Sequence, residues 1–139
     1  MESVLNRDSG VKGICGVNDM RTIGERAQAG DPQARLALSI YCYRIKKYIG
    51  AYLAILGGLD ALVFTGGIGE NAAFVRAGVC AGLSHLGIAV DPARNAQPPG
   101  QAFPIHAEGR PVRVLVIPTN EELAIAEATQ AVIRGEAGD

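Results

Sequence analysis

The residues whose types and spacing best fit a chemical role lie in the middle of the chain, at Gly66-Gly67-Ile68-Gly69-Glu70-Asn71. They follow an apolar, β-rich run, residues 59–65, and precede apolar positions spaced as in a helix. Glycines at such a junction let the backbone approach a ligand closely, and the N–H groups at a helix start point outward. The segment predicts phosphate or nucleotide binding, although the same glycines also suit a plain strand-to-helix turn.

The same segment fits a rival pattern. Gly67-Ile68-Gly69-Glu70-Asn71-Ala72 matches the G-x-G-x-x-G/A motif of dinucleotide-binding proteins, and Asp91 follows about 20 residues later, where a ribose-binding acid would lie. This reading favours an NAD-dependent oxidoreductase. Against it, Glu70 at a helix start would repel a pyrophosphate, and a long helix precedes the motif. A non-catalytic nucleotide-binding module is a third reading.

Other polar and reactive residues carry weaker signals. Thr119-Asn120-Glu121-Glu122 fits a capping box at the start of a final helix, in which the Thr119 hydroxyl accepts an N–H and Glu122 reaches back. His85 and His106 indicate packing rather than catalysis. Cys15, Cys42 and Cys80 read as small apolar core residues, because nothing beside them would lower a thiol pKa.

Composition narrows the class of protein. With 139 residues, 48% hydrophobic and 19% charged, the chain fits one domain with a real core. A net charge of −1 argues against nucleic acid or an anionic membrane as partner. Three widely spaced cysteines disfavour disulfides and zinc, so we expect a cytoplasmic setting. The start of the chain lacks a signal-peptide pattern, and no run approaches the roughly 20 apolar residues of a membrane span.

The elements expected around the glycines alternate between helix and strand. In order, we predict a loop over residues 1–17 with a possible helical turn at 2–6, a helix over 20–29 capped by Asn18 or Asp19, a helix over 32–56 capped by Asp31, a strand over 59–65, a helix over 71–86, a strand over 87–90, a proline-rich mobile surface segment over 91–110, a strand over 111–117 and a helix over 121–134. The long second helix should run through the middle of the structure, and the strand over 59–65 should be covered on both faces. The fold class is α/β, with a βαβ unit over residues 59–90.

Five separated motifs in this order resemble the carboxy-terminal third of the acetate kinase family. They are Leu5-Asn6 through Ser9-Gly10, Gly13, Gly16-Val17 and Asp19-Met20-Arg21; Tyr43-Arg44-Ile45-Lys46-Lys47-Tyr48-Ile49-Gly50; Gly57-Gly58-Leu59-Asp60; Phe64-Thr65 with the glycine segment; and Pro118-Thr119-Asn120-Glu121-Glu122. The family belongs to the acetate and sugar kinase and actin superfamily, whose members bind ATP between two related ribonuclease H-like domains. The resemblance implies a ribonuclease H-like α/β domain over residues 1–139, incomplete relative to the two-domain kinase.

The resemblance also implies site residues. Gly67, Ile68, Gly69, Glu70 and Asn71 should line the nucleotide pocket, Asp19, Met20 and Arg21 should contact the adenosine side, and Glu121 should serve Mg²⁺. One departure is that only Asn18 precedes the Asp-x-Arg triplet, where the family commonly has two small or hydroxyl residues. ATP or ADP, Mg²⁺ and acetate or propionate are the implied ligands, and the full-length form should be a homodimer. The family's catalytic residues lie upstream of the matched segment, so none is assigned here.

Overall fold

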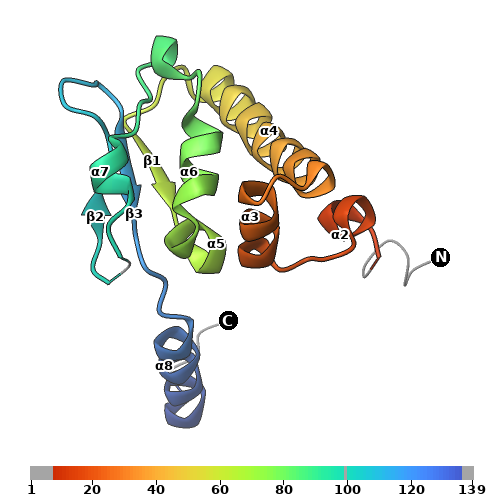
Figure 1. Ribbon diagram of the computed structural model, residues 1–139. Helices are drawn as coiled ribbons and strands as arrows, with labels where there is room; N and C mark the ends of the chain where they lie inside the picture. The colour runs from red at the N-terminus through yellow and green to blue at the C-terminus, as the bar shows by residue number, and fades with distance from the viewer. Residues whose placement is uncertain (1–7, 99, 136–139) are drawn as a thin grey trace.

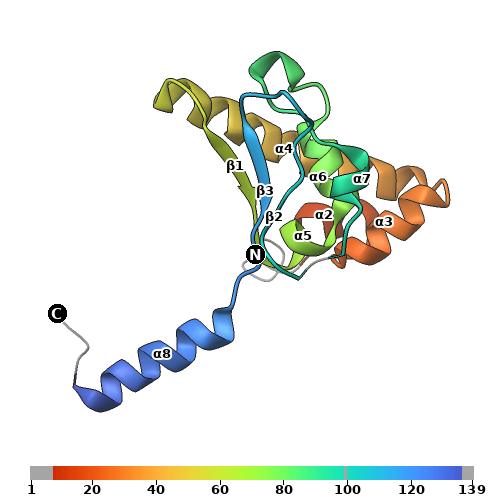
Figure 2. The same ribbon diagram turned by 90° about the vertical axis from the view of Figure 1, so that its left-hand side faces the viewer.

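The chain forms a small mixed sheet with helices packed against one face (Figure 1, Figure 2). The computed structural model describes residues 8–98 and 100–135. The elements, labelled as in Figure 1, are α2 (Gly10–Cys15), α3 (Met20–Gln28), α4 (Pro32–Leu56), β1 (Ala61–Phe64), α5 (Gly66–Asn71), α6 (Ala73–Cys80), the 3-10 helix η1 (Ser84–Leu86), α7 (Pro92–Asn95), β2 (Phe103–Pro104), β3 (Arg113–Val116) and α8 (Glu121–Arg134).

The sheet has the order β1-β3-β2. β1 and β3 are parallel, with Leu62 opposite Val114 and Phe64 opposite Val116, whereas β2 is antiparallel to β3. Because side chains alternate along a strand, these four residues share one face of the sheet. Val114 and Val116 are fully buried there, but Val63 on the opposite face is 44% exposed. The expectation that this strand is covered on both faces is therefore wrong, since helices cover one face only.

The first two long helices begin where their capping residues predicted. The Asp19 carboxylate accepts a hydrogen bond from the N–H of Thr22 at 2.7 Å, which satisfies a donor that the first turn of α3 leaves free. Asp31 caps α4 in the same way, and Pro32 occupies its first position. Gly57, with φ of 72°, ends α4 in the left-handed conformation.

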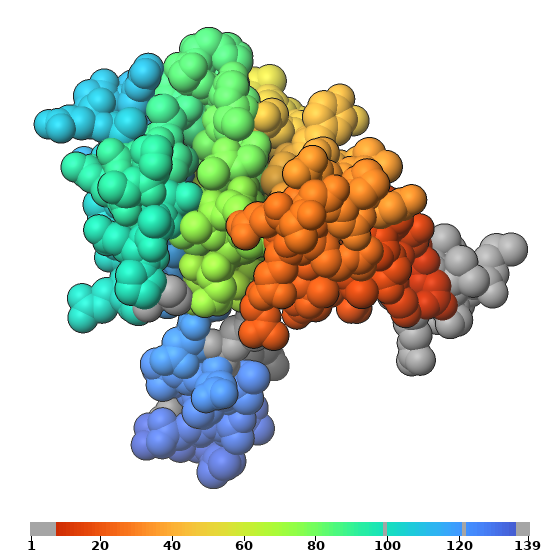
Figure 3. Space-filling model, viewed as in Figure 1, coloured from red at the N-terminus to blue at the C-terminus, as the bar shows by residue number. Residues whose placement is uncertain are grey.

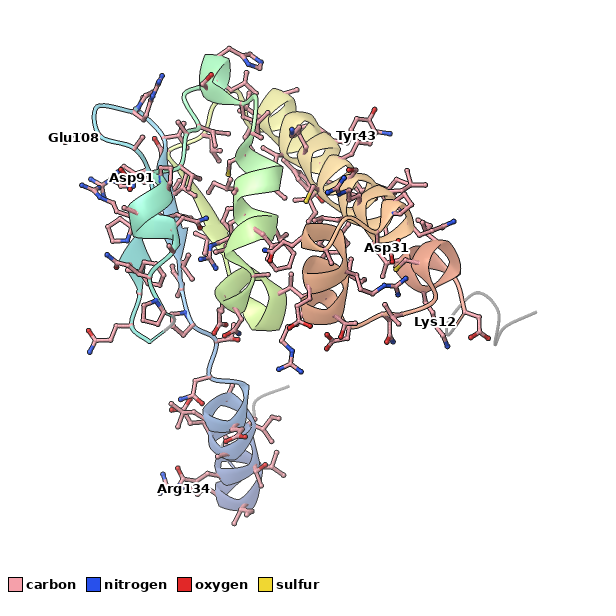
Figure 4. All side chains as sticks on the ribbon, in the orientation of Figure 1. Lys12, Asp31, Tyr43, Asp91, Glu108 and Arg134 are labelled. Carbon is pink, nitrogen blue, oxygen red and sulfur yellow. The ribbon has the colours of Figure 1, made fainter. Side chains whose placement is uncertain are left out.

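The long helix α4 does not run through the middle of the structure. Only Ala34, Ala37 and Cys42 are buried along its 25 residues. Leu38, Tyr41, Ile45 and Ile49 pack partly against the core, but other large apolar residues of the helix are exposed, and Tyr43, which is 62% exposed, extends away from the rest of the protein (Figure 4). The expectation was wrong because the apolar pattern surrounds the helix, while the chain supplies neighbours on one side only.

Two segments are more ordered than the sequence indicated. Residues 10–15, expected to be a loop, form the helix α2, which buries Cys15 and ends at Gly16 with φ of 80°. The possible turn at residues 2–6 lies outside the described residues. The proline-rich segment over 91–110 forms α7 and β2 and is anchored by the buried residues Asn95 and Ile105, while most of its other described residues are exposed, as expected of a surface segment.

The region after β1 differs from the expected βαβ unit. The glycine segment is itself helical, as α5, and the predicted helix over 71–86 is interrupted at Ala72 and ends at Cys80. Residues 87–90 form no strand, and only Val90 makes an isolated bridge, to His106. The parallel partner of β1 is β3, so the crossover between them contains α5, α6, η1, α7 and β2.

The last helix, α8, projects from the rest of the protein, as Figure 2 and Figure 3 show. Among its described side chains, every residue but Ala131 is exposed. Leu123, Ile125, Val132 and Ile133 are between 50% and 80% exposed. Within the ranges that the structure describes, no helix combines the length and the apolar character needed to cross a membrane.

Candidate functional site

The carboxyl ends of the parallel strands β1 and β3 lie side by side at one edge of the sheet. The N–H of Ile117 donates to the Phe64 carbonyl at 3.0 Å, which extends the pairing by one residue. β1 leads into α5, hereafter the glycine turn (66–71), and β3 leads into residues 117–120 before α8. Ligands of open α/β sheets bind at the carboxyl ends of the strands. Two of the motifs singled out in the sequence therefore meet where such a site is expected.

A carboxylate joins these two motifs directly. Glu70 Oε1 accepts hydrogen bonds from the backbone N–H of Thr119 at 2.9 Å and from its hydroxyl at 3.0 Å. These bonds, the backbone one above all, hold the pKa of Glu70 below its usual value, because they stabilise the charged form. Glu70 thus lies in the last turn of α5 and not at a helix start.

The contact with Glu70 also corrects the expected capping box. The Thr119 hydroxyl is a donor to Glu70 and does not cap α8. Asn120 is the capping residue instead, since its Oδ1 accepts from the N–H of Leu123 at 3.0 Å. Sequence alone did not separate these roles, because Thr and Asn are both good N-caps.

The three glycines of the turn differ in their surroundings and in their backbone conformation. A Cβ atom at Gly69 would lie 3.2 Å from the carbonyl carbon of Phe64, so this glycine lets the turn pack against the backbone of β1. Gly66 has φ of +71°, which other residues rarely adopt. A Cβ atom at Gly67 would meet nothing within 4 Å, so its backbone borders open space. A Cβ atom at Gly66 would also meet nothing within 4 Å, but of the three only Gly67 combines that open space with an ordinary backbone conformation.

A cavity of about 490 Å³ opens beside the glycine turn, between α4 and β1. Tyr41, Ile45 and Ile49 of α4 form one wall, and residues 62–69 form another. The walls are predominantly apolar and therefore offer contact area rather than charge.

The segment Asp19-Met20-Arg21 reaches the same edge from α3. The ring of Phe74 on α6 packs directly on Gly24 of α3, where a Cβ atom would lie 2.6 Å from the ring. Figure 1 accordingly shows the start of α3 beside α5. The structure thus joins two of the predicted segments at the strand ends and places the start of the third beside α5.

The three residues of that segment have different environments. The Asp19 carboxylate is engaged as the helix cap, and the hydrogen bond from the Thr22 N–H holds its pKa below the usual value. Met20 is 7% exposed and belongs to the core. Arg21 is exposed, so its guanidinium is available to a ligand.

One functional candidate was missed by the sequence analysis. Arg76 on α6 is 1% exposed and donates to both the side chain and the carbonyl of Asn95, each at 2.7 Å. Its Nη1 donates to the carbonyls of Gly69 and Glu70, each at 2.8 Å. The available signal was a single arginine on the apolar face that Val75 and Val79 define.

Glu121, the predicted magnesium ligand, begins α8, and its side chain lies outside what the structure describes. The residues described contain no group of three or more His, Cys, Asp or Glu side chains able to hold a metal ion. Magnesium commonly takes one or two protein carboxylates and keeps several waters. A single carboxylate at the start of α8 is therefore a compatible donor set.

The cysteines agree with the expected structural roles, whereas His85 does not pack as expected. The three thiols are free and buried, and burial raises the pKa of Cys80 to about 11 and raises that of Cys42 as well. His85 is exposed on η1. The Nδ1 atom of His106 is buried and has no hydrogen-bond partner among the described residues.

The interpretation of the glycine segment as a dinucleotide-binding motif loses its structural basis. Asp91 follows an isolated bridge rather than a parallel strand, and its carboxylate caps α7 by accepting from the N–H of Arg94 at 2.8 Å (Figure 4). A ribose-binding acid would follow the second strand of a βαβ unit, and that strand is not formed. Fold and site define an α/β protein with a small mixed sheet and a candidate ligand site at the strand ends.

Comparison with known proteins identifies the family. The model of the acetokinase family matches residues 1–127, and the chain therefore belongs to this family. Acetate kinase from Nitratidesulfovibrio vulgaris (strain DP4) is 58% identical over 134 residues, which are 96% of this chain and 33% of that protein. The recognition made from the sequence motifs is confirmed.

Solved structures agree with this assignment. The acetate kinase of Porphyromonas gingivalis superimposes with a TM-score of 0.84 at 42% identity, over 95% of this chain and 33% of that one. A propionate kinase from Francisella tularensis subsp. tularensis SCHU S4 gives a TM-score of 0.82 at 43% identity, over 91% of this chain and 32% of that one. The expected actin-like α/β fold class is confirmed. The chain spans about a third of the length of the relatives it matches.

Proposed function

We propose that residues 1–139 are the carboxy-terminal, nucleotide-binding portion of a carboxylate kinase. The whole enzyme would transfer a phosphoryl group reversibly between ATP and acetate, giving ADP and acetyl phosphate. The observation that carries this proposal is the meeting of the glycine turn and residues 117–120 at the carboxyl ends of β1 and β3, where Glu70 is bonded to Thr119, with the start of α3 beside α5 (Figure 1). Propionate is the alternative acceptor, because one similar structure is a propionate kinase.

Each segment would have its own task. Gly67, Ile68, Gly69, Glu70 and Asn71 would form the wall of the nucleotide pocket. The segment Asp19-Met20-Arg21 would contact the adenosine side through the exposed Arg21, with Asp19 capping α3 and Met20 anchoring the segment in the core. Glu70 would act by fixing residues 118–120 rather than by touching phosphate, since Thr119 already occupies its carboxylate. Glu121 would hold Mg²⁺ through a coordinated water, and the bound ion would neutralise phosphate charge during transfer.

This chain alone should not catalyse the reaction. Phosphoryl transfer needs in-line positioning and cations that stabilise the transferring group. The family resemblance assigns those groups to the part of the relatives that this chain does not cover. We expect acetyl phosphate formation from ATP and acetate at the level of a blank, and turnover well above it would overturn this distribution of roles. The homodimer and the cytoplasmic location are further proposals that follow from the family.

Nucleotide binding is the direct test. We expect calorimetric titration of the chain to show weak binding of Mg-ADP or Mg-ATP and little or no binding of NADH, because the other wall of the cleft is absent. Gly67→Val should abolish nucleotide binding by filling the open space beside the turn. NADH binding that is equal or tighter, and sensitive to Asp91→Ala, would contradict the proposal.

The metal assignment needs a separate experiment in a full-length enzyme carrying this segment. Glu121→Gln keeps the size of the side chain and removes its charge. If Glu121 serves magnesium, this variant should raise the magnesium requirement and lower turnover strongly while the fold remains intact. Unchanged magnesium dependence would leave Glu121 only as a helix-start residue, stabilised by the helix dipole.

A further inference from the structure

Arg76 is a buried cation that forms no ion pair with an acidic side chain among the described residues. Among the residues described, Arg76 and Asn95 are the buried polar ones, and the ion pairs formed there involve other residues. Burial lowers the pKa of the guanidinium, since the apolar surroundings disfavour its charge. Four oxygen atoms accept hydrogen bonds from the guanidinium and offset the cost of burying its charge. They belong to the Asn95 side chain, the Asn95 carbonyl and the carbonyls of Gly69 and Glu70.

Two of these acceptors belong to the glycine turn. The last carbonyls of a helix have no partner within it and carry partial negative charge. The Nη1 atom of Arg76 donates hydrogen bonds to two of these carbonyls, those of Gly69 and Glu70. At the other end of the turn, Thr65 makes no side-chain capping bond. The turn is therefore held from its carboxyl end.

Asn95 completes the arrangement from the far side. Its Nδ2 donates to the carbonyl of Ala73 at 2.8 Å while its Oδ1 accepts from Arg76, so both ends of the amide are used. Asn95 is the last residue of α7, whose first turn is fixed by the Asp91 cap. Helix α7 thereby supports the glycine turn through a single guanidinium.

We propose that Arg76 and Asn95 form a positioning pair that holds the glycine turn in its binding conformation and so sets nucleotide affinity. The effect on affinity rests on the proposed function, whereas the effect on the turn does not. Arg76 does not touch the ligand. A fork of donors is needed because the acceptors lie in different directions, which a lysine ammonium on a flexible stem does not match.

The test compares Arg76→Lys with Arg94→Lys. Arg94 is an exposed arginine on α7 that donates to the His106 carbonyl at 3.3 Å, so it controls for losing a guanidinium in the same region. Amide hydrogen exchange of residues 66–72 and Mg-ADP titration are the readouts. In Arg76→Lys we expect exchange in the turn to rise and affinity to fall by about tenfold or more, the loss of one to two charged hydrogen bonds. Arg94→Lys should match the wild type.

Asn95→Ala keeps the proposal testable if Arg76→Lys does not fold. It removes one of four acceptors and should give the same local pattern, more weakly. Unchanged exchange in the turn, or exchange raised uniformly over all helices, would overturn the positioning role. A wild-type chain that binds no Mg-ADP, with faster exchange in the turn of Arg76→Lys, would refute the proposed function and retain the control of the turn by Arg76.

Discussion

The two sides of α4 carry different kinds of apolar residue, and only one side is covered. Toward α3 and α6 the helix presents small residues, Ala34, Ala37 and Cys42, all buried. On its other side lie large ones, among them Tyr43, Tyr52 and Ile55, which are between 61% and 79% exposed. These exposed side chains therefore gain little from the folding of this chain alone, whereas Leu38, Tyr41, Ile45 and Ile49 of the same helix pack partly against the core.

The covered side shows why small residues were needed there. A Cβ atom at Gly78 of α6 would lie 2.9 Å from the sulfur of Cys42, so the two helices meet almost backbone to backbone. α4 thus packs on α6 along one part of its length and on α3 along another (Figure 1). The comparison teaches that burial in this protein follows the position of neighbouring elements and not the size of the apolar side chain.

The largest effect should come from removing apolar volume on the covered side. Ile23 on α3 is fully buried, and Ile23→Ala should lower the free energy of unfolding by about 2–5 kcal/mol, because it leaves a cavity. Ile55→Ala, also in a helix but at a residue 79% exposed, should change it by no more than about 0.5 kcal/mol. Urea unfolding followed by circular dichroism measures both. Equal losses would mean that the outer side of α4 is covered in solution.

A smaller effect on stability should distinguish Gly69 from Gly67, two positions of the glycine turn. Gly69→Val forces a side chain against the backbone of β1 and should destabilise the chain by about 1–3 kcal/mol. Gly67→Val meets open space and should leave the urea midpoint nearly unchanged while abolishing nucleotide binding. Loss of stability in Gly67→Val would show that the turn packs more tightly than its surroundings indicate.

The uncovered surfaces should drive association of the chain with itself. Contiguous exposed apolar surface favours such contacts, and α4 and α8 both present it. Ile55→Glu and Ile133→Glu should each weaken self-association about tenfold or more if both helices take part. An effect of one variant alone would identify the helix responsible. Sedimentation across micromolar concentrations measures this, with Gln101→Glu as an exposed polar control. A strictly monomeric wild-type chain would contradict the expectation.

The smallest effect concerns the charge of Glu70. Its folded pKa is lowered, so the contribution of the carboxylate to stability is present above its ordinary pKa of 4.5 and is lost as the pH falls through the folded value. Glu70→Gln should therefore be slightly less stable than the wild type at pH 7, and the difference should disappear at low pH. Urea midpoints at several pH values test this. A difference that grows on acidification would reverse the sign of the argument.

Local sequence signals predicted several element boundaries correctly. Asp19, Asp31 and Gly57 mark helix ends where the structure has them, because capping needs only neighbouring residues. The β-branched run before Pro118 likewise became β3. Residues 87–90 were wrongly expected to form a strand, because their short apolar pattern does not reveal whether a neighbouring strand will pair with them.

The candidate site likewise has features that the local sequence predicts and features that it does not. The residue types and order of the motifs identified the family and pointed to the glycine turn, since these features lie within short stretches of chain. The bond from Thr119 to Glu70 spans 49 positions and the bonds from Arg76 to Asn95 span 19, so neither follows from local pattern. Proximity across such separations is created by the packing of helices on the sheet. The sequence determined which segments could bind a ligand, and the tertiary structure decided which side chains hold them in place.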